Sequence, residues 1–210
     1  MIYRKATITD LDSVVNLSAI AFKKDPLYKI IEIYCKNEST YLDFVKNSQR
    51  SFIKSSLASS STVCLVSQNQ GKVVAFAILE RPNHKKTNFI SYMRHGGWKL
   101  FHTTNLFNLL KYIKLLEQVI EPLNKIESPN WYLAHFAVDV DYQGKSIGSK
   151  MLKECVLPYL KKHKGYLLTL CTQTLKNSKF YDKNGFSLFD HRILTLNHHH
   201  LKTWSFYLKF

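Results

Sequence analysis

A short loop between an apolar strand and an amphipathic helix holds the residues of this chain best suited to chemistry. Its sequence is Gln143-Gly144-Lys145-Ser146-Ile147-Gly148. Backbone N–H groups and the helix dipole at a helix N-terminus favour an anion, and small residues let phosphate oxygens approach the backbone. The segment therefore predicts a phosphate-binding loop, while a plain helix start remains the alternative at this point.

Two familiar phosphate loops do not fit this segment. Gly144-Lys145-Ser146 matches the end of a Walker A loop, but Asp139 stands where a glycine should open it. The G-x-G-x-x-G spacing of a dinucleotide-binding loop is absent as well. The sequence thus disfavours both the nucleoside-triphosphate and the dinucleotide interpretation.

The elements that must position this loop alternate between strands and helices. A capping box is expected at Thr9 to Asp12, and residues 82–95 are expected to form a loop. This alternation predicts one domain, 1–210, with a mixed α/β sheet and no internal repeat or linker. Strands are expected at 2–8, 62–67, 73–81, 131–140, 166–174, 186–196 and 204–209, and helices at 11–22, from Pro26, and at 39–57, 98–116, 149–164 and 177–184.

The composition fits an ordinary folded domain with a strong positive charge. The 210 residues are 45% apolar, and 30 Lys+Arg against 15 Asp+Glu give a net charge of +15. The longest apolar run, 73–79, is far shorter than the roughly 20 residues that span a membrane. No apolar stretch typical of a secretory signal follows Arg4, Lys5 and Asp10. We expect a cytoplasmic protein with an anionic partner, while a lysine-rich composition alone also explains the charge.

The cysteines and the histidine triplet favour no metal site. Cys35, Cys64, Cys155 and Cys171 show no C-x-x-C spacing and are expected to be reduced, packed thiols. The run 198–200 consists of three histidines in an expected hairpin turn, without the Cys or carboxylate partners of a closed site. We therefore expect no metal.

The loop and the segments after it resemble the GNAT superfamily of acyl-CoA-dependent N-acyltransferases. The superfamily's signature is Q/R-x-x-G-x-G/A, and Ser146 stands at its first glycine. Asn177, Phe180-Tyr181 and Asn184-Gly185-Phe186 follow in the superfamily's order. The branch around puromycin N-acetyltransferase looks most similar, on Trp131-Tyr132-Leu133, Val156-Leu157-Pro158 and Thr203-Trp204.

The resemblance implies the GNAT fold, with a central, mostly antiparallel mixed sheet of six to seven strands that is splayed after the strand ending near Val138. It implies acetyl-CoA as cofactor, with a cofactor-binding core at 131–186. The freed strand edge would hold the pantetheine arm, and the loop would wrap the pyrophosphate. The residues implied to bind the cofactor are Phe136, Ala137, Val138, Gln143, Gly144, Lys145, Ser146, Ile147, Gly148, Ser149, Asn177 and Tyr181.

The implied reaction is direct transfer of the acetyl group to a primary amine in a ternary complex. The N–H of Val138 would meet the developing oxyanion, and Tyr181 would act as general acid on the leaving thiolate. His135 and Glu80 remain open as the general base, and His135 equally suits a core position. Cys171 stands where the puromycin-type branch has Glu, and an acyl-Cys route is disfavoured because no His partner is evident.

The acceptor is expected to be a small molecule bound by the helices at 26–60 and 97–118. A protein or aminoacyl-tRNA acceptor, a non-catalytic acyl-CoA-binding module and a homodimer remain open, and no membrane partner is expected. One aromatic-rich stripe is expected in the core or the substrate cleft: Trp98, Phe101, Leu106, Phe107, Leu110, Ile113 and Leu116.

Overall fold

The computed structural model describes residues 1–82, 89–126 and 129–210 of the chain. Seven strands form one sheet in the order β1-β2-β3-β4-β5-β7-β6, and all neighbours are antiparallel except β4 and β5. This confirms the predicted mixed, mostly antiparallel sheet. The strands are β1 (Ile2–Lys5), β2 (Thr62–Asn69), β3 (Lys72–Glu80), β4 (Trp131–Val138), β5 (Leu167–Thr172), β6 (Ser187–Leu196) and β7 (His199–Lys209).

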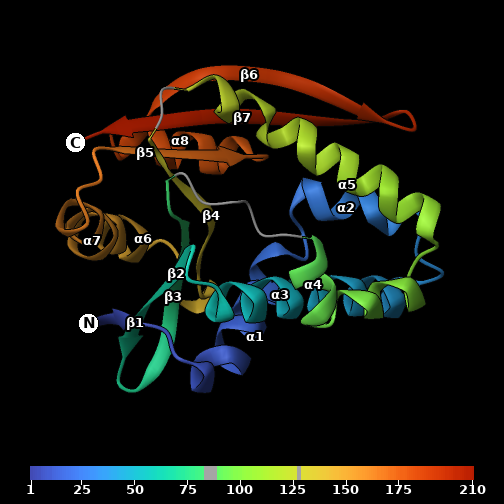
Figure 1. Cartoon of the computed structure of the whole chain (residues 1–210), viewed down its shortest axis with the longest axis horizontal. Helices are drawn as coiled ribbons and strands as arrows, with labels where there is room; N and C mark the ends of the chain where they lie inside the picture. The colour runs from blue at the N-terminus through green and yellow to red at the C-terminus, as the bar shows by residue number, and fades with distance from the viewer. Residues whose placement is uncertain (83–88, 127–128) are drawn as a thin grey trace.

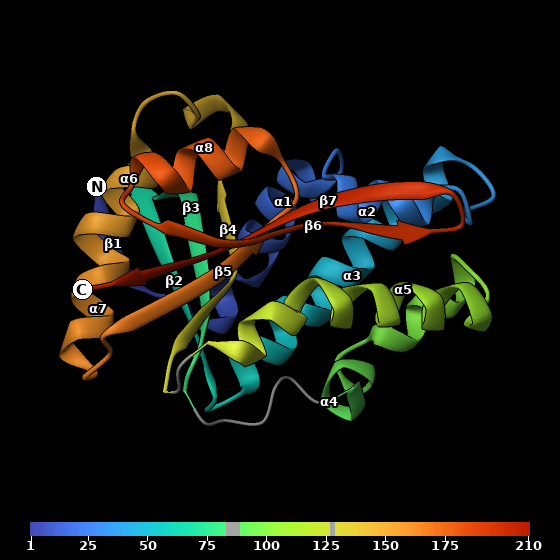
Figure 2. The ribbon, with the colours of Figure 1, turned by 90° about the horizontal axis from the view of Figure 1, so that it is seen from above.

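Helices cover both faces of the sheet (Figures 1 and 2). One face packs against α6, α7 and α8, and the other against α1 and α3, while α5 crosses beside the long β6–β7 hairpin. The helices are α1 (Leu11–Phe22), α2 (Pro26–Glu32), α3 (Glu38–Ala58), α4 (Phe89–Arg94), α5 (Leu106–Ile120), α6 (Ile147–Met151), α7 (Leu157–Lys162) and α8 (Leu175–Lys183). Short 3₁₀ turns are Ile8–Asp10, Gly97–His102, Glu121–Lys125 and Val140–Tyr142, and a π-helical turn, Leu152–Val156, joins α6 to α7.

Two buried layers lie against the sheet, and a third apolar cluster lies beside it. The largest layer fills the space between the sheet and α6–α8, and includes Met151, Leu168 and Phe206. The third cluster joins α2, α3 and α5 around Phe44 and Tyr112. The helices at 26–60 and around 97–118 thus form a lobe beside the sheet, joined to it by the end of α3, where Ile53 packs on the strands.

Three local predictions were wrong. The capping box lies at Thr7 and Asp10, because the Asp10 carboxylate accepts the Thr7 backbone N–H at 2.8 Å and the first strand already ends at Lys5. A helix, α4, occupies part of the expected loop at 82–95, of which residues 83–88 lie outside the described residues. The expected helix at 98–116 is broken, because Asn105 caps a new helix by accepting the Asn108 N–H at 2.9 Å.

A place in the core, one of the two expected for the aromatic-rich stripe, is wrong for most of its members, while the substrate cleft stays a prediction. Trp98, Phe101, Leu106, Phe107 and Leu110 are exposed, and 66% of Phe107 is accessible. The helix α5 is apolar on two adjoining faces, and the face that packs inward carries Leu109, Tyr112, Leu115 and Val119. Periodicity identified the helix but not which of these faces lies inside.

No helix in the described part of the chain has the length and apolar character needed to cross a membrane. The four cysteines are free thiols, as predicted, and two of them, Cys64 and Cys155, are buried. Among the described residues, no three or more His, Cys, Asp or Glu side chains are grouped so that they could hold a metal ion.

Candidate functional site

The strands β4 and β5 pair only at their beginnings and then separate. Trp131 lies opposite Leu168 and Tyr132 opposite Thr169, and no further pairs follow. From there β4 stays on β3 while β5 stays on β7, so the two strands run in different directions (Figure 1). The register between β3 and β4 shifts near Leu133 and His135, which adds a bulge at Ala134. The expected splay is therefore present.

The separation leaves polar backbone groups of β4 without a strand partner on one side. The Asp139 N–H donates to the Val74 carbonyl of β3 at 2.8 Å. Because successive residues of a strand direct their N–H and C=O groups to opposite sides, Ala137 also faces β3, while Phe136 and Val138 face the split. Of the three predicted strand residues, Phe136 and Val138 thus present backbone groups to the split, whereas the backbone groups of Ala137 point to β3.

The phosphate-type loop leads from the end of β4 into α6. Gly144 and Ser146 both adopt positive φ, of 76° and 59°, and α6 begins at the next residue, Ile147. A Cβ built on Gly144 would meet nothing within 4 Å, so this part of the loop faces free space. Ser146, which replaces the signature glycine, therefore takes the left-handed conformation that a glycine would adopt without strain.

Basic side chains surround the loop. The Lys145 Nζ donates to the Asp141 carbonyl at 3.0 Å, and the Lys176 Nζ donates to the Gln143 Oε1 at 3.2 Å. The Gln143 Nε2 in turn donates to the Val138 carbonyl at 3.2 Å. This chain of contacts joins the strand end, the loop and the first turn of α8, and it places two ammonium groups beside a helix N-terminus.

Helix α8 faces the loop from the opposite side of the split. Thr174 caps it by accepting the Asn177 N–H at 3.1 Å, which places the predicted residue Asn177 in the first turn. The ring of Phe180 stacks on Phe136 with centroids 6.1 Å apart. A Cβ on Gly148 would lie 3.1 Å from the Phe180 ring, so glycine permits the close approach of α6 to α8.

Tyr181 lies buried one residue further along α8. Its ring contacts Phe186 and Phe206, with centroids 5.4 and 6.1 Å away. Burial raises the pKa of Tyr181 well above its usual value, so the phenol keeps its proton at neutral pH. Burial raises the pKa of Tyr132 well above its usual value, and its ionisable neighbours are Cys171, Glu80 and Tyr181, so these groups share one region near the point where the strands separate.

The two candidate bases have different surroundings. His135 stacks on Phe52 with ring centroids 4.3 Å apart, and burial lowers its pKa to about 4. Glu80 lies opposite Tyr132 in the register of β3 with β4 and is half-buried. An imidazole with so low a pKa accepts a proton poorly at neutral pH, which favours Glu80 of the two.

The thiol of Cys171 is not activated. Burial raises its pKa to about 11, and its Sγ donates to the Val119 carbonyl at 3.3 Å. A thiol that holds its proton this firmly is a weak nucleophile at neutral pH. This agrees with the prediction that an acyl-Cys route is disfavoured.

One acidic residue near this region was not among the sequence candidates. Asp25 is the N-cap of α2, where its Oδ1 accepts the Leu27 N–H at 2.9 Å. Burial raises the pKa of Asp25 to about 6. In the sequence, the pair Asp25-Pro26 indicates only a helix start, so it gave no reason to select Asp25 as a site residue.

The comparisons with known proteins agree with this geometry. A family model described as an acetyltransferase (GNAT) domain matches residues 114–188, which include β4, the loop, α6–α8 and β5. No curated protein matches the chain in sequence.

Solved N-acetyltransferase structures share the fold over nearly the whole chain. An agmatine N-acetyltransferase is 13% identical, with a TM-score of 0.66, covering 100% of this chain and 99% of its own. A polyamine N-acetyltransferase of Drosophila melanogaster is 12% identical, with a TM-score of 0.61 and the same coverage. PaiA N-acetyltransferase of Thermoplasma acidophilum, solved with coenzyme A, is 15% identical, with a TM-score of 0.59, covering 100% of this chain and 98% of its own. The chain has the GNAT fold, and the domain match with these neighbours supports an acyltransferase.

Proposed function

We propose that this chain is an N-acetyltransferase that moves the acetyl group of acetyl-CoA to a primary amine of a small molecule, by direct transfer in a ternary complex. The observation that carries the proposal is the split between β4 and β5, with a helix N-terminus at its open end. A free strand edge beside an anion-binding loop suits a ligand with an amide-rich arm and a pyrophosphate.

The residues around the split fit coenzyme A. Phe136 and Val138 offer the backbone groups that a pantetheine arm would pair with, and the free space at Gly144 leaves room for phosphate oxygens. Lys145 and Lys176 supply positive charge, and Asn177 lies across the split on α8. The remaining proposed contacts are Gln143, Ser146, Ile147, Gly148 and Ser149 around the helix start, and Ala137 as part of the strand.

The bound cofactor would supply an acetyl group activated as a thioester. We assign to the Val138 N–H the stabilisation of negative charge on the acyl oxygen, and to Tyr181 the donation of a proton to the departing sulfur. The Tyr181 phenol carries its proton at neutral pH, as this role requires, and burial raises its pKa and so makes it a weaker donor than a free phenol. Glu80 is proposed as the base, acting directly or through water, because burial makes His135 a poor one.

The acceptor would enter from the lobe built by 26–60 and 97–118, opposite the cofactor-binding core at 131–186. Neighbours with this fold are named for agmatine and polyamines, which are small amines. These names support a small amine as acceptor. The likeness to the puromycin-type branch stays a prediction.

The net charge of +15 favours a second candidate, a protein or RNA-linked acceptor with an anionic surface. Residues 142–210 contain 12 Lys+Arg and 3 Asp+Glu, so 9 of the 15 net positive charges lie in this third of the chain. Coenzyme A needs only some of these. A steep loss of activity between low and physiological salt would point to the macromolecular acceptor.

The proposed function is tested with purified protein, acetyl-CoA and a panel of primary amines. We expect acetyl-CoA to raise the melting temperature, because a ligand that binds the folded state stabilises it by mass action. We also expect acetylated amine and free CoA in equal amounts, measured by mass spectrometry so that the four free thiols do not interfere. No thermal shift at millimolar acetyl-CoA contradicts the proposal, and a shift without turnover on any amine indicates a binding module.

A further inference from the structure

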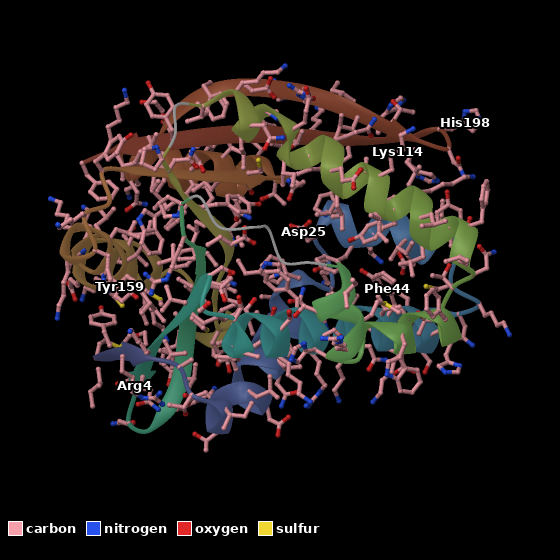
Figure 3. The ribbon with its side chains drawn as sticks, in the orientation of Figure 1. Arg4, Asp25, Phe44, Lys114, Tyr159 and His198 are labelled. Atoms are coloured by element: carbon pink, nitrogen blue, oxygen red, sulfur yellow. The ribbon has the colours of Figure 1, made fainter. Side chains whose placement is uncertain are left out.

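Asp25 is half-buried, and its carboxylate has no cationic partner among the residues that the structure describes. The ion pairs formed by those residues involve other acidic side chains, although the chain has 30 Lys+Arg. Figure 3 places Asp25 near the middle of the molecule, between α5 and α4. The N-cap bond to Leu27 occupies Oδ1, and burial raises the pKa of the carboxyl to about 6. An ionised carboxylate in such surroundings is stabilised by a cation.

Two tyrosines, Tyr28 and Tyr112, are neighbours of this carboxylate, and a third packs in the same cluster. Tyr28 of α2, Tyr92 of α4 and Tyr112 of α5 pack into one cluster. Burial raises the pKa of Tyr28 and Tyr112, and the nearby charge of Asp25 raises both further. Aromatic faces attract cations, and a carboxylate among them supplies the opposite charge. The combination suits a small organic cation.

A second, independent sign of a ligand lies between this cluster and the split. Both ring nitrogens of His135 are buried and have no hydrogen-bond partner among the described residues. Phe22 connects the two places, because its ring centroid is 6.1 Å from that of Tyr28 and 5.1 Å from that of His135. A buried polar ring without partners marks a position where a bound molecule would supply the missing hydrogen bond.

We propose that Asp25 and the tyrosines around it bind a positively charged group of the acceptor, so that the preferred acceptor carries at least two amino or guanidino groups. One amine reacts at the split, while the other stays charged beside Asp25. This inference rests on the proposed acetyl transfer. The net charge of +15 repels cations from most of the surface, so a cationic acceptor requires local negative charge where it binds.

The test compares two amines that differ only in the second charge, 1,4-diaminobutane and n-butylamine. We expect the wild-type chain to favour the diamine. Asp25→Asn removes the charge and retains an N-cap, since Asn caps helices as well as Asp does. It should lower kcat/KM for 1,4-diaminobutane by about 10- to 100-fold, as expected for loss of one charge-assisted hydrogen bond. Turnover of n-butylamine should stay within about twofold of wild type.

Asp12→Asn is the matched control, because Asp12 is an exposed carboxylate on α1, outside the segments assigned to the acceptor and the cofactor, and its loss changes the net charge equally. It should leave both amines unaffected. Melting temperatures of both variants establish that they are folded. An equal loss for both amines in Asp25→Asn, or no preference for the diamine in wild type, overturns the inference while leaving acetyl transfer intact.

Failure of the proposed function has a different signature. If no amine is acetylated, calorimetric binding of 1,4-diaminobutane tests the carboxylate by itself. Binding to wild type that Asp25→Asn removes supports the cation site. Absence of binding to wild type overturns it.

Discussion

The side-chain amide of Gln143 donates a hydrogen bond to the backbone carbonyl of Val138, with 3.2 Å between Nε2 and the oxygen. Its Oε1 accepts from the Lys176 Nζ of α8 at 3.2 Å. One side chain therefore joins the end of β4, the loop and the helix across the split. It occupies the Val138 carbonyl and leaves the Val138 N–H available on the same side of the strand.

Replacing Gln143 with alanine should weaken acetyl-CoA binding more than turnover. Without the two hydrogen bonds, the loop and Lys176 lose their fixed relation to β4, and ordering them costs binding free energy. We expect KM for acetyl-CoA to rise about 3- to 10-fold with kcat within about twofold. Gln118→Ala, at an exposed position of α5, is the control. Unchanged KM in Gln143→Ala would remove the side chain from the cofactor site.

Replacing Ser146 with glycine should stabilise the protein. Its φ of 59° lies in the left-handed region, which costs a non-glycine residue about 1 kcal/mol. Ser146→Gly should raise the free energy of unfolding by roughly 0.5–1 kcal/mol, whereas Ser146→Val should lower it by about 1–2 kcal/mol. Urea unfolding measures both changes.

Ser149→Gly makes the same substitution three residues later, within α6. There glycine should destabilise by about 0.5 kcal/mol, because it loses more backbone entropy in a helix than serine does. If the two glycine variants shift stability in the same direction, backbone strain at Ser146 is not the cause.

Tyr181→Phe tests the proposed proton donor. The ring packs against Phe186 and Phe206, and phenylalanine preserves that packing. A general acid acts in the transition state, so kcat should fall about 10- to 100-fold while the Kd for acetyl-CoA stays the same. Tyr166→Phe, at an exposed tyrosine, should change neither. A kcat equal to that of wild type would exclude the phenol as acid.

The parts of the site that follow from local sequence were predictable. The glycine-containing loop and the end of α8 before Gly185, whose φ is +87°, depend on neighbours in the chain, whereas the start of α8 was expected at 177 and lies at Leu175, with Thr174 as its cap. The split depends on the bulge in β4 and on the pairing of β4 with β3, and no longer with β5, beyond Tyr132. Only the family resemblance indicated it. The mostly antiparallel character of the sheet was likewise inferred from that resemblance, whereas the order of its strands was not predicted.

The residues that sequence reasoning missed owe their role to distant partners. Asp25 looks like an ordinary N-cap, and the cation-binding role proposed for it depends on a tyrosine far along the chain, Tyr112 of α5. The prediction of a core position for the exposed side of α5 failed for a related reason. Its Phe107 and Leu109 lie in the same apolar segment, and tertiary packing alone decides which of them is covered.

The Arg4–Asp10 pair should make stability depend on pH in acid. Arg4 Nη1 and Nη2 donate to Asp10 at 2.7 Å each, and these bonds lower the pKa of Asp10 to about 2. A depressed folded-state pKa means that the pair stabilises above the unfolded pKa of about 4 and loses its effect as pH falls towards 2. Asp10→Asn should therefore lower the free energy of unfolding by about 1–2 kcal/mol at pH 7, measured by urea unfolding. The difference from wild type should shrink below about pH 4. Asp43→Asn should show little change at either pH, and a difference for Asp10→Asn that persists undiminished at pH 2.5 would mean that lost packing, and not charge, causes the destabilisation.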